Sequence, residues 1–168
     1  RLMQLFRNEL QIGFENKGYS ISVEPLDIPN LIFAEPNINC VLSCKPDNQG
    51  FKLKGNLSCN LLMHCDRCLT EFQNHQDILF NLILTSQNDF LSEENDEIIF
   101  FTEDMEQIDI SPFIKDAIQL STPMKTLCEK SCKGLCSHCG INLNMQPCNC
   151  KSREKRKPFE KLDHLISN

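Results

Sequence analysis

The sequence has no tryptophan, one tyrosine and six glycines among its 168 residues. It also contains no apolar run approaching the roughly 20 residues that a membrane-spanning helix needs. The first residues, with Arg1, Arg7 and Glu9, lack the apolar stretch of a signal peptide. These absences predict a cytoplasmic protein with no membrane partner. In that reducing compartment, cysteines bind metals or remain free thiols rather than forming disulfides.

No residue pattern typical of an enzyme is present. The four histidines, His64, His75, His138 and His164, are scattered along the chain. Neither a nucleophile elbow nor a phosphate-binding loop occurs. We therefore expect no catalytic residues and no small-molecule substrate.

Cysteine, by contrast, is abundant: the chain has eleven, and six of them fall within 23 residues near its C-terminal end. Thiols at this density are either disulfide-bonded or share a soft metal ion. Cys136 and Cys139 form a C-x-x-C followed by Gly140, which can turn with positive φ while backbone amides face the sulfurs. Cys148 and Cys150 can supply the other two ligands of a tetrahedral zinc ion.

A second C-x-x-C, Cys65-Asp-Arg-Cys68, lies between two stretches in which apolar and polar residues alternate. This position predicts a zinc knuckle at the tip of an antiparallel hairpin. A redox-active C-x-x-C would instead begin a helix in a βαβ unit, and no such helix is visible. His138 lies between Cys136 and Cys139, where it can replace a ligand, but we expect it to face solvent.

Eight cysteines therefore have metal-type spacings, which is twice the four ligands of a structural zinc ion, so we expect two ions. The eight are Cys65, Cys68, Cys128, Cys132, Cys136, Cys139, Cys148 and Cys150. In the expected grouping the last four share one ion, and the first four join segments about 60 residues apart on the other. The competing grouping gives the middle four one ion and leaves the first two as a free pair. Cys40, Cys44 and Cys59 are expected to be buried core thiols.

Hydrophobic periodicity predicts a fold made mainly of strands. Apolar residues occupy every second position from Phe51 to Cys65 and again from Ile78 to Leu84, which indicates two long, half-buried strands. Shorter strands are expected at 21–23, 39–44 and 98–101, with a hairpin loop at 45–50. Most of the first 35 residues fit no single period, and we leave them unassigned.

One helix is expected from Ser111 to Ser121. Ser111 is placed as its N-cap and Pro112 as its first helical residue. Pro123 then ends the helix. Its buried stripe comprises Phe113, Ile114, Ala117 and Ile118. A second short helix is expected at the end of the chain, where Phe159, Leu162, Leu165 and Ile166 recur.

Together these patterns predict an α+β protein. Its antiparallel β-sheet, either open or closed into a barrel, carries one or two short helices and a cysteine-rich C-terminal zinc-binding module. Residues 1–123 form the β domain with its C-x-x-C hairpin and helix 111–121. Residues 124–150 form the zinc-binding module, and residues 151–168 form a basic C-terminal tail.

Charge is divided unevenly along the chain. Residues 1–123 hold 8 Lys or Arg against 19 Asp or Glu, a net charge of −11, whereas residues 124–161 hold 9 against 3, a net charge of +6. A phosphate backbone would therefore be attracted mainly to the second part. The expected RNA contacts are Lys130, Lys133, Lys151, Arg153, Lys155, Arg156 and Lys157. A solvated tail is the alternative, and the acidic stretch 87–109 is interpreted as solvated rather than as a binding surface.

Six motifs complete the sequence evidence. They are Cys65-Asp-Arg-Cys68-Leu69, Ile108-Asp-Ile-Ser-Pro, Pro123-Met-Lys-Thr-Leu-Cys128, Cys132-Lys-Gly-Leu-Cys136, Cys139-Gly-Ile-Asn-Leu-Asn144 and Cys148-x-Cys150. In combination, over roughly residues 40–166, they resemble the YceD family of large ribosomal RNA subunit accumulation proteins. The resemblance implies a bacterial or plastid-type protein needed for normal accumulation of large-subunit ribosomal RNA, without established catalytic activity.

The sequence departs from that family after its last cysteine. The family commonly has an acidic stretch with Asp-Pro-Arg there, whereas residues 151–158 of this chain are basic.

Three functions remain open. The first is a zinc-stapled adaptor in large-subunit ribosome assembly, with ribosomal RNA or a ribosomal or assembly protein as partner. The others are a zinc-thiolate redox sensor and a nucleic-acid-binding regulator of transcription.

Overall fold

The computed structural model describes residues 3–48, 50–86 and 97–150. This part of the chain is mostly β-structure with two short α-helices and one 3-10 turn, as predicted. The elements are β1 (Gln4–Phe6), α1 (Arg7–Ile12), β2 (Phe14–Ser22), η1 (Glu24–Leu26), β3 (Ile32–Phe33), β4 (Asn37–Asp47), β5 (Gly50–His64), β6 (Glu71–Thr85), β7 (Glu97–Phe100), β8 (Gln107–Asp109) and α2 (Ser111–Ser121). Neither α-helix in these ranges is long and apolar enough to cross a membrane.

The main sheet has the strand order β2-β4-β5-β6-β7, with β3 added to β5. A separate two-stranded sheet joins β1 to β8. The outer strands β2 and β7 of the main sheet do not pair in the described structure, so the sheet is open and the barrel alternative is wrong. The expectation of a purely antiparallel sheet also needs correction, because β7 pairs with β6 in parallel over Leu82–Thr85. Strand direction depends on how the connection returns, which side-chain alternation does not encode.

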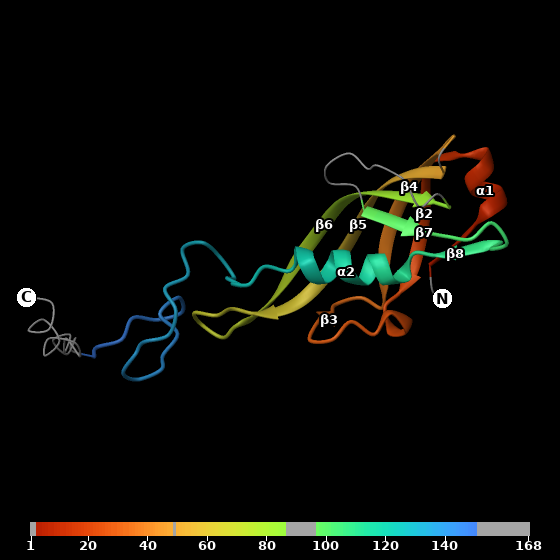
Figure 1. Cartoon of the computed structure of the whole chain (residues 1–168). Coiled ribbons are helices and arrows are strands. Elements are labelled where there is room, and N and C mark those ends of the chain that lie inside the picture. The colour runs from red at the N-terminus through yellow and green to blue at the C-terminus, as the bar shows by residue number, and fades with distance from the viewer. Residues whose placement is uncertain (1–2, 49, 87–96, 151–168) are drawn as a thin grey trace, which may run out of the picture.

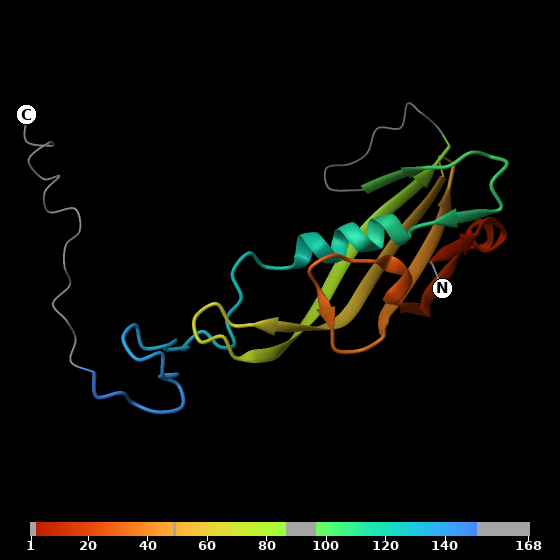
Figure 2. The same ribbon diagram turned by 90° about the horizontal axis from the view of Figure 1, so that it is seen from below.

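The longest hairpin, β5–β6, is paired from Phe51 and Leu84 at one end to His64 and Glu71 at the other. Its predicted alternation is confirmed, since Leu53, Leu57 and Leu61 are buried on one face while their neighbours are more exposed. Figures 1 and 2 show the closed end of this hairpin extending beyond the body of the sheet. Residues 122–150 lie at that end, so the fold places the cysteine-rich segment beside the hairpin tip.

Helix α2 lies across one face of the sheet (Figures 1 and 2). Its residues Ile114 and Ile118 are fully buried and join the core formed by Leu42, Leu53 and Leu82 of the strands. The helix ends at Ser121, as predicted. It therefore covers the apolar face of the sheet and delivers the chain toward the hairpin tip.

The predicted N-cap of α2 is wrong. The cap position is Ile110, which makes no side-chain capping bond, and Ser111 is the first helical residue. Ser111 is buried, and its hydroxyl oxygen accepts the backbone N–H of Met3 at 2.7 Å. The Ser111 N–H is in turn donated to a carboxylate oxygen of Asp109 at 2.9 Å. Ser111 thus connects the N-terminal segment to the helix. The sequence does not show this role, because its partner Met3 is 108 positions away.

Two further strand boundaries differ from the sequence-based expectation. The 45–50 loop is shorter than predicted, because β4 and β5 stay paired as far as Asp47 and Gly50. Pro46 is tolerated there because β4 has no β2 partner beyond Cys44. The strand expected at 21–23 is the end of β2, which begins at Phe14.

The three core thiols lie where they were predicted. Cys40, Cys44 and Cys59 are all buried among the apolar side chains of the sheet. Burial raises the pKa of Cys40 and of Cys44 to about 11, so both remain protonated at neutral pH. They are structural residues and belong to no cysteine cluster.

Several predictions concern residues that lie outside the described ranges. They include the basic residues of the 151–168 tail, its short helix and the 87–96 part of the acidic stretch. The strand expected at 98–101 is confirmed as β7, at Glu97–Phe100.

Candidate metal centres

The first cysteine cluster joins the tip of the β5–β6 hairpin to the segment that follows α2. Cys65 and Cys68 occupy the hairpin tip, and Cys128 and Cys132 come from the later segment. Cys65, Cys68 and Cys132 are buried, and Cys128 is half-buried. Their four sulfurs lie within 4.8 Å of one another. The structure thus brings together the cysteines expected to share the long-range site.

Hydrogen bonds fix the two segments of this first cluster against each other. Asp66 and Thr126 exchange two of them: the Asp66 N–H donates to the Thr126 carbonyl at 2.9 Å, and the Thr126 N–H donates to an Asp66 carboxylate oxygen at 2.7 Å. The Arg67 guanidinium donates to the Cys132 carbonyl at 2.9 Å, and the Arg67 carbonyl accepts the N–H of Leu135 at 3.0 Å. These contacts position the sulfurs beside the few apolar side chains that pack against the buried cysteines.

Gly134 makes this docking possible. It has φ +77°, and a Cβ at this position would lie 3.1 Å from the Arg67 carbonyl oxygen. Only glycine combines that backbone conformation with so close an approach. This docking therefore explains the glycine in the Lys-Gly-Leu sequence between Cys132 and Cys136.

The second cluster is local. Cys136, Cys139, Cys148 and Cys150 have their sulfurs within 4.8 Å of one another. The Cys136 N–H donates to the Ile141 carbonyl at 2.8 Å, and the Gly140 N–H donates to the Cys136 carbonyl at 3.0 Å, which closes the loop between the first two cysteines. Cys139 and Cys150 are exposed. This site is therefore formed by one short segment and is open to solvent.

Asparagine side chains connect the two clusters. Asn144 lies in the loop of the second cluster, yet its amide donates to the sulfur of Cys132 in the first cluster at 3.2 Å. Its side-chain oxygen accepts the Lys133 N–H at 2.7 Å. Asn142 donates to the Thr70 hydroxyl at 3.2 Å, next to Cys68. Hydrogen bonds of this kind orient metal ligands and tune their basicity.

In the first cluster the pKa values of the cysteines diverge. Burial raises the pKa of Cys65, but backbone N–H groups of Cys128, Arg67 and Cys68 that face its sulfur lower it to about 6. For Cys128, burial and the neighbouring thiols raise the pKa to about 12. Hydrogen bonds from the Thr70 hydroxyl and backbone also lower the pKa of Cys68, so Cys128 is the thiol of this cluster that resists adding more negative charge. A bound cation would remove that resistance.

The second cluster shows the same divergence. The backbone N–H groups of Cys139 and His138 lower the pKa of Cys136 to about 6. A hydrogen bond with the Cys139 side chain is the main cause that raises the pKa of Cys150 to about 12. Both clusters therefore have the charge pattern of a cation site, in which binding would expel protons.

The sulfur positions fit a tetrahedral ion. Four sulfurs about 2.3 Å from a zinc ion lie about 3.8 Å from one another. The Cys65–Cys132 and Cys68–Cys128 sulfurs are each 3.7 Å apart, and the Cys136–Cys148 sulfurs are 3.3 Å apart. A disulfide needs about 2.05 Å, and all eleven cysteines are free. Each cluster can therefore hold one metal ion.

Of the other predicted site residues, some lie within the described residues and some lie outside them. His138 is exposed, as predicted, and belongs to neither cysteine group. Both described lysines are exposed: Lys130 lies between two cysteines of the first cluster, and Lys133 lies between the two clusters. The remaining five, Lys151, Arg153, Lys155, Arg156 and Lys157, lie outside the described residues. The sequence analysis missed the parts played by Asp66, Thr126, Asn142 and Asn144, whose only signal was polar residues placed next to cysteines.

A Ser-His-Asp group occurs on the exposed face of the sheet. His75 Nε2 lies 3.1 Å from Asp77 and 3.5 Å from the Ser58 hydroxyl, and its Nδ1 lies 2.7 Å from Asn60. In a catalytic triad the serine and the carboxylate contact opposite nitrogens of the imidazole. Here both contact the same nitrogen, so this group lacks the geometry that activates a serine.

Comparison with known proteins connects the cysteine-rich segment to one family. The family model described as "Large ribosomal RNA subunit accumulation protein YceD" matches residues 53–166, which is more than half of the chain. The chain belongs to the YceD family. The matched region begins in β5 and contains all eight clustered cysteines. No solved structure matches the YceD chain.

Three curated relatives illustrate the similarity. The chain is 37% identical over 67 residues to the "Large ribosomal RNA subunit accumulation protein YCED homolog 1, chloroplastic" of Arabidopsis thaliana, which covers 40% of this chain and 21% of that protein. It is 42% identical over 59 residues to the protein of the same name from Zea mays, covering 34% and 20%. An uncharacterized protein of Mycobacterium leprae is 27% identical over 115 residues, covering 66% and 51%. This YceD chain thus aligns with about a fifth to a half of the length of these relatives.

Proposed function

We propose that this YceD protein is a non-catalytic, zinc-stapled factor that supports accumulation of large-subunit ribosomal RNA. The two four-cysteine clusters carry the proposal, because both lie in the region that the family shares and each can hold a metal ion. The ribosomal RNA part of the proposal rests on the name of the family and of its plant relatives. The protein acts by binding RNA, or a ribosomal or assembly protein, rather than by chemistry.

Zinc is the metal that the ligands favour. A closed set of four cysteines is typical of structural zinc sites. The proposed ligands of one ion are Cys65, Cys68, Cys128 and Cys132, and those of the other are Cys136, Cys139, Cys148 and Cys150. A reducing compartment such as the cytoplasm would keep them free of disulfides and available to a metal ion. Elemental analysis of protein purified without chelator should give close to two zinc ions per chain. Disulfides without metal, or iron with visible absorption, would contradict this assignment.

RNA contact is assigned to the basic residues on and after the metal-binding loops. Lys130 and Lys133 are the described members, and the five basic residues at 151–157 extend the set. Five contacts to a single strand should give a slope of roughly −3.5 in a plot of log affinity against log salt. Replacing the five by Gln should weaken binding of a large-subunit RNA fragment and flatten that slope. Replacing Lys45, Lys52 and Lys54 of the sheet should do neither. If the tail variant keeps its affinity and slope, the partner is a protein.

The cellular role is tested by complementation. Cells lacking the protein should accumulate less large-subunit than small-subunit ribosomal RNA, and the intact chain should restore the ratio. The Cys65→Ser/Cys68→Ser variant should fail to restore it, whereas Cys59→Ala, which changes a core thiol outside both clusters, should succeed. Full restoration by the double variant would show that the first cluster is not needed for function.

A second candidate function, zinc-thiolate redox sensing, is favoured by the exposure of Cys139 and Cys150. Exposed thiolates are the ones that oxidants reach first. Mild peroxide should then release the second ion well before the first. Release of both ions at equal rates, or of neither, would rule out a sensor built on the second cluster.

A further inference from the structure

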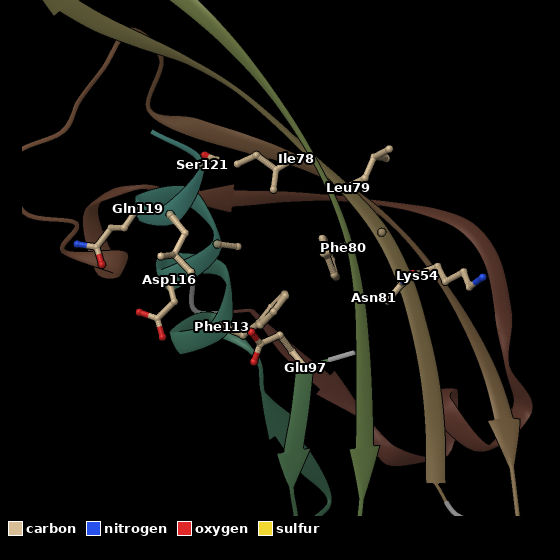
Figure 3. Close-up of a pocket in the computed structure, with 13 residues that line it drawn as sticks. Lys54, Ile78, Leu79, Phe80, Asn81, Glu97, Phe113, Asp116, Gln119 and Ser121 are labelled. Atoms are coloured by element: carbon tan, nitrogen blue, oxygen red, sulfur yellow. The ribbon is translucent and has the colours of Figure 1, made fainter. Parts of the chain in front are cut away.

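A groove of about 990 Å³ lies between α2 and β6 (Figure 3). Ile78 and Phe80 of β6 and Phe113 and Ala117 of α2 contribute its apolar wall, and Leu120 lies at its rim with 82% of its surface exposed. The rings of Phe80 and Phe113 are 5.1 Å apart between centroids. This groove is formed by the sheet and helix, and no clustered cysteine lines it.

The groove runs beside a free strand edge. β6 pairs with β5 from Glu71 to Leu84, but β7 covers its other edge only from Leu82 to Thr85. Within the described ranges, no strand pairing or inter-element backbone hydrogen bond covers that edge from Glu71 to Asn81. Such an edge offers a row of unpaired N–H and C=O groups to an incoming strand. An added strand would gain these backbone bonds and place alternate side chains against the groove.

Charge narrows the choice of occupant. The groove is lined by two carboxylates, Glu97 and Asp116, and one cation, Lys54. Neither carboxylate forms an ion pair with another described residue. The net charge of −11 on residues 1–123 repels both RNA and a second copy of the same surface. It attracts a cationic polypeptide instead.

We propose that an extended segment of another protein, rich in Lys or Arg and carrying alternate apolar residues, docks on the free edge of β6. Its backbone would extend the sheet and its apolar side chains would enter the groove. Because alternate side chains of a strand point to opposite faces, its cations would lie on the outer face, beside the exposed Glu71 and Asp77 of β6. This proposal does not depend on the metal centres or on RNA contact. It adds a protein-binding site to the acidic part of the chain, residues 1–123, whereas the proposed RNA contacts lie in the basic part that follows.

The probe is a fluorescent peptide of alternating Lys and Val, about ten residues long to match the free edge. Its controls are a Glu–Val peptide and two N-methylated Lys–Val peptides. One is methylated at the amides of the Lys residues and the other at the amides of the Val residues. Fluorescence anisotropy with the full chain should show the Lys–Val peptide binding at least roughly tenfold more tightly than the Glu–Val peptide. Only one methylated form should lose binding, because alternate amides of a strand face its neighbour.

A pair of protein variants locates the site. Leu120→Lys places a cation at the groove rim and should weaken Lys–Val binding roughly tenfold. Met124→Lys makes the same charge change at a fully exposed residue that does not line the groove, and should alter binding less than about twofold. Circular dichroism of both variants checks that the sheet is intact.

Four outcomes would overturn the proposal. The first is binding that ignores peptide charge, and the second is binding by both methylated forms as tight as the parent's. The third is equal weakening by the two variants, which would reveal a general charge effect. The fourth is a different occupant: a dimer, seen by analytical ultracentrifugation, that Leu120→Lys dissociates, or a 151–168 peptide that displaces the Lys–Val probe at lower concentration than unlabelled probe does.

Discussion

The sheet and the cysteine-rich segment are held together by different means. In the sheet, Leu and Ile side chains from most of the strands and from α2 form one continuous buried core. In residues 122–150, only Leu127 and Leu135 pack partly against the cysteines, while Met124 and Met145 are almost fully exposed. A segment with so little buried apolar surface cannot offset the entropy of ordering its chain. The difference indicates that burial stabilises the sheet, and it predicts that the segment depends on metal ions bound at the two cysteine clusters.

Metal removal should separate the two regions most completely. A strong chelator should unfold residues 122–150 and leave the sheet folded, because structural zinc supplies on the order of 10 kcal/mol of folding free energy in small zinc domains. Trypsin cleavage after Lys125, Lys130 and Lys133 should then accelerate, while the β signal in circular dichroism stays. Loss of that β signal on chelation would show that the sheet also needs the metal.

The two clusters should fail separately when their ligands are removed. Cys65→Ser/Cys68→Ser should lose one zinc ion and release the segment from the hairpin tip, whereas Cys148→Ser/Cys150→Ser should lose the other ion and keep the segment attached. Elemental analysis and protease mapping distinguish these effects. An unchanged zinc content in the first variant would instead favour the competing grouping of the four cysteines from 128 to 139.

A change in the sheet should leave the metal sites intact. A Cβ on Gly55 would lie 2.4 Å from the Phe80 ring, so Gly55→Ala should lower the free energy of unfolding by about 1–3 kcal/mol through overpacking. Gly18→Ala is the matched control, because nothing lies within 4 Å of the added atom. Urea unfolding measures both variants, and both should retain two zinc ions. Equal stability of the two variants would contradict the packing at Phe80.

A change outside the ligand sets tests the link between the clusters. Asn144→Ala removes the hydrogen bond to the Cys132 sulfur and should weaken zinc binding at the first cluster by roughly 10–100-fold, although Asn144 is not a ligand. Chelator competition measures the affinity of each site, and exposed Gln146→Ala serves as the control. An unchanged affinity would mean that the two loops are only neighbours.

Local periodicity was enough to predict the elements that carry the site. β5 alternates more buried with more exposed residues, β6 alternates half-buried with exposed residues up to Asn81, and α2 has a clear apolar stripe, so their patterns do not depend on distant partners. The hairpin tip at Cys65–Cys68 followed from those strands. The grouping of Cys65 and Cys68 with Cys128 and Cys132 followed from ligand counting, and the structure brings those four together.

Other elements depend on contacts that a sequence does not show. α1 has six residues with one buried side chain, Leu10, too short for a helical period to be seen. β1 and β8 are three residues each and exist by pairing with one another across about a hundred positions. The hydroxyl of Ser111 and the amide of Asn144 have partners whose identity only the fold supplies. Elements too short to show a period, and contacts between residues far apart in the sequence, therefore could not be predicted.

The long-range cluster also imposes an order on biosynthesis. Cys128 follows Cys68 by 60 residues along the chain. At roughly 5–20 residues per second, the ribosome needs about 3–12 s to synthesise that interval. During this time the hairpin tip offers a metal ion two sulfurs, and the four-sulfur site closes only after Cys132 has emerged. β7, β8 and α2 are made in between, so a metal ion bound at this cluster would lock the hairpin tip only in a chain whose sheet and covering helix have already been translated.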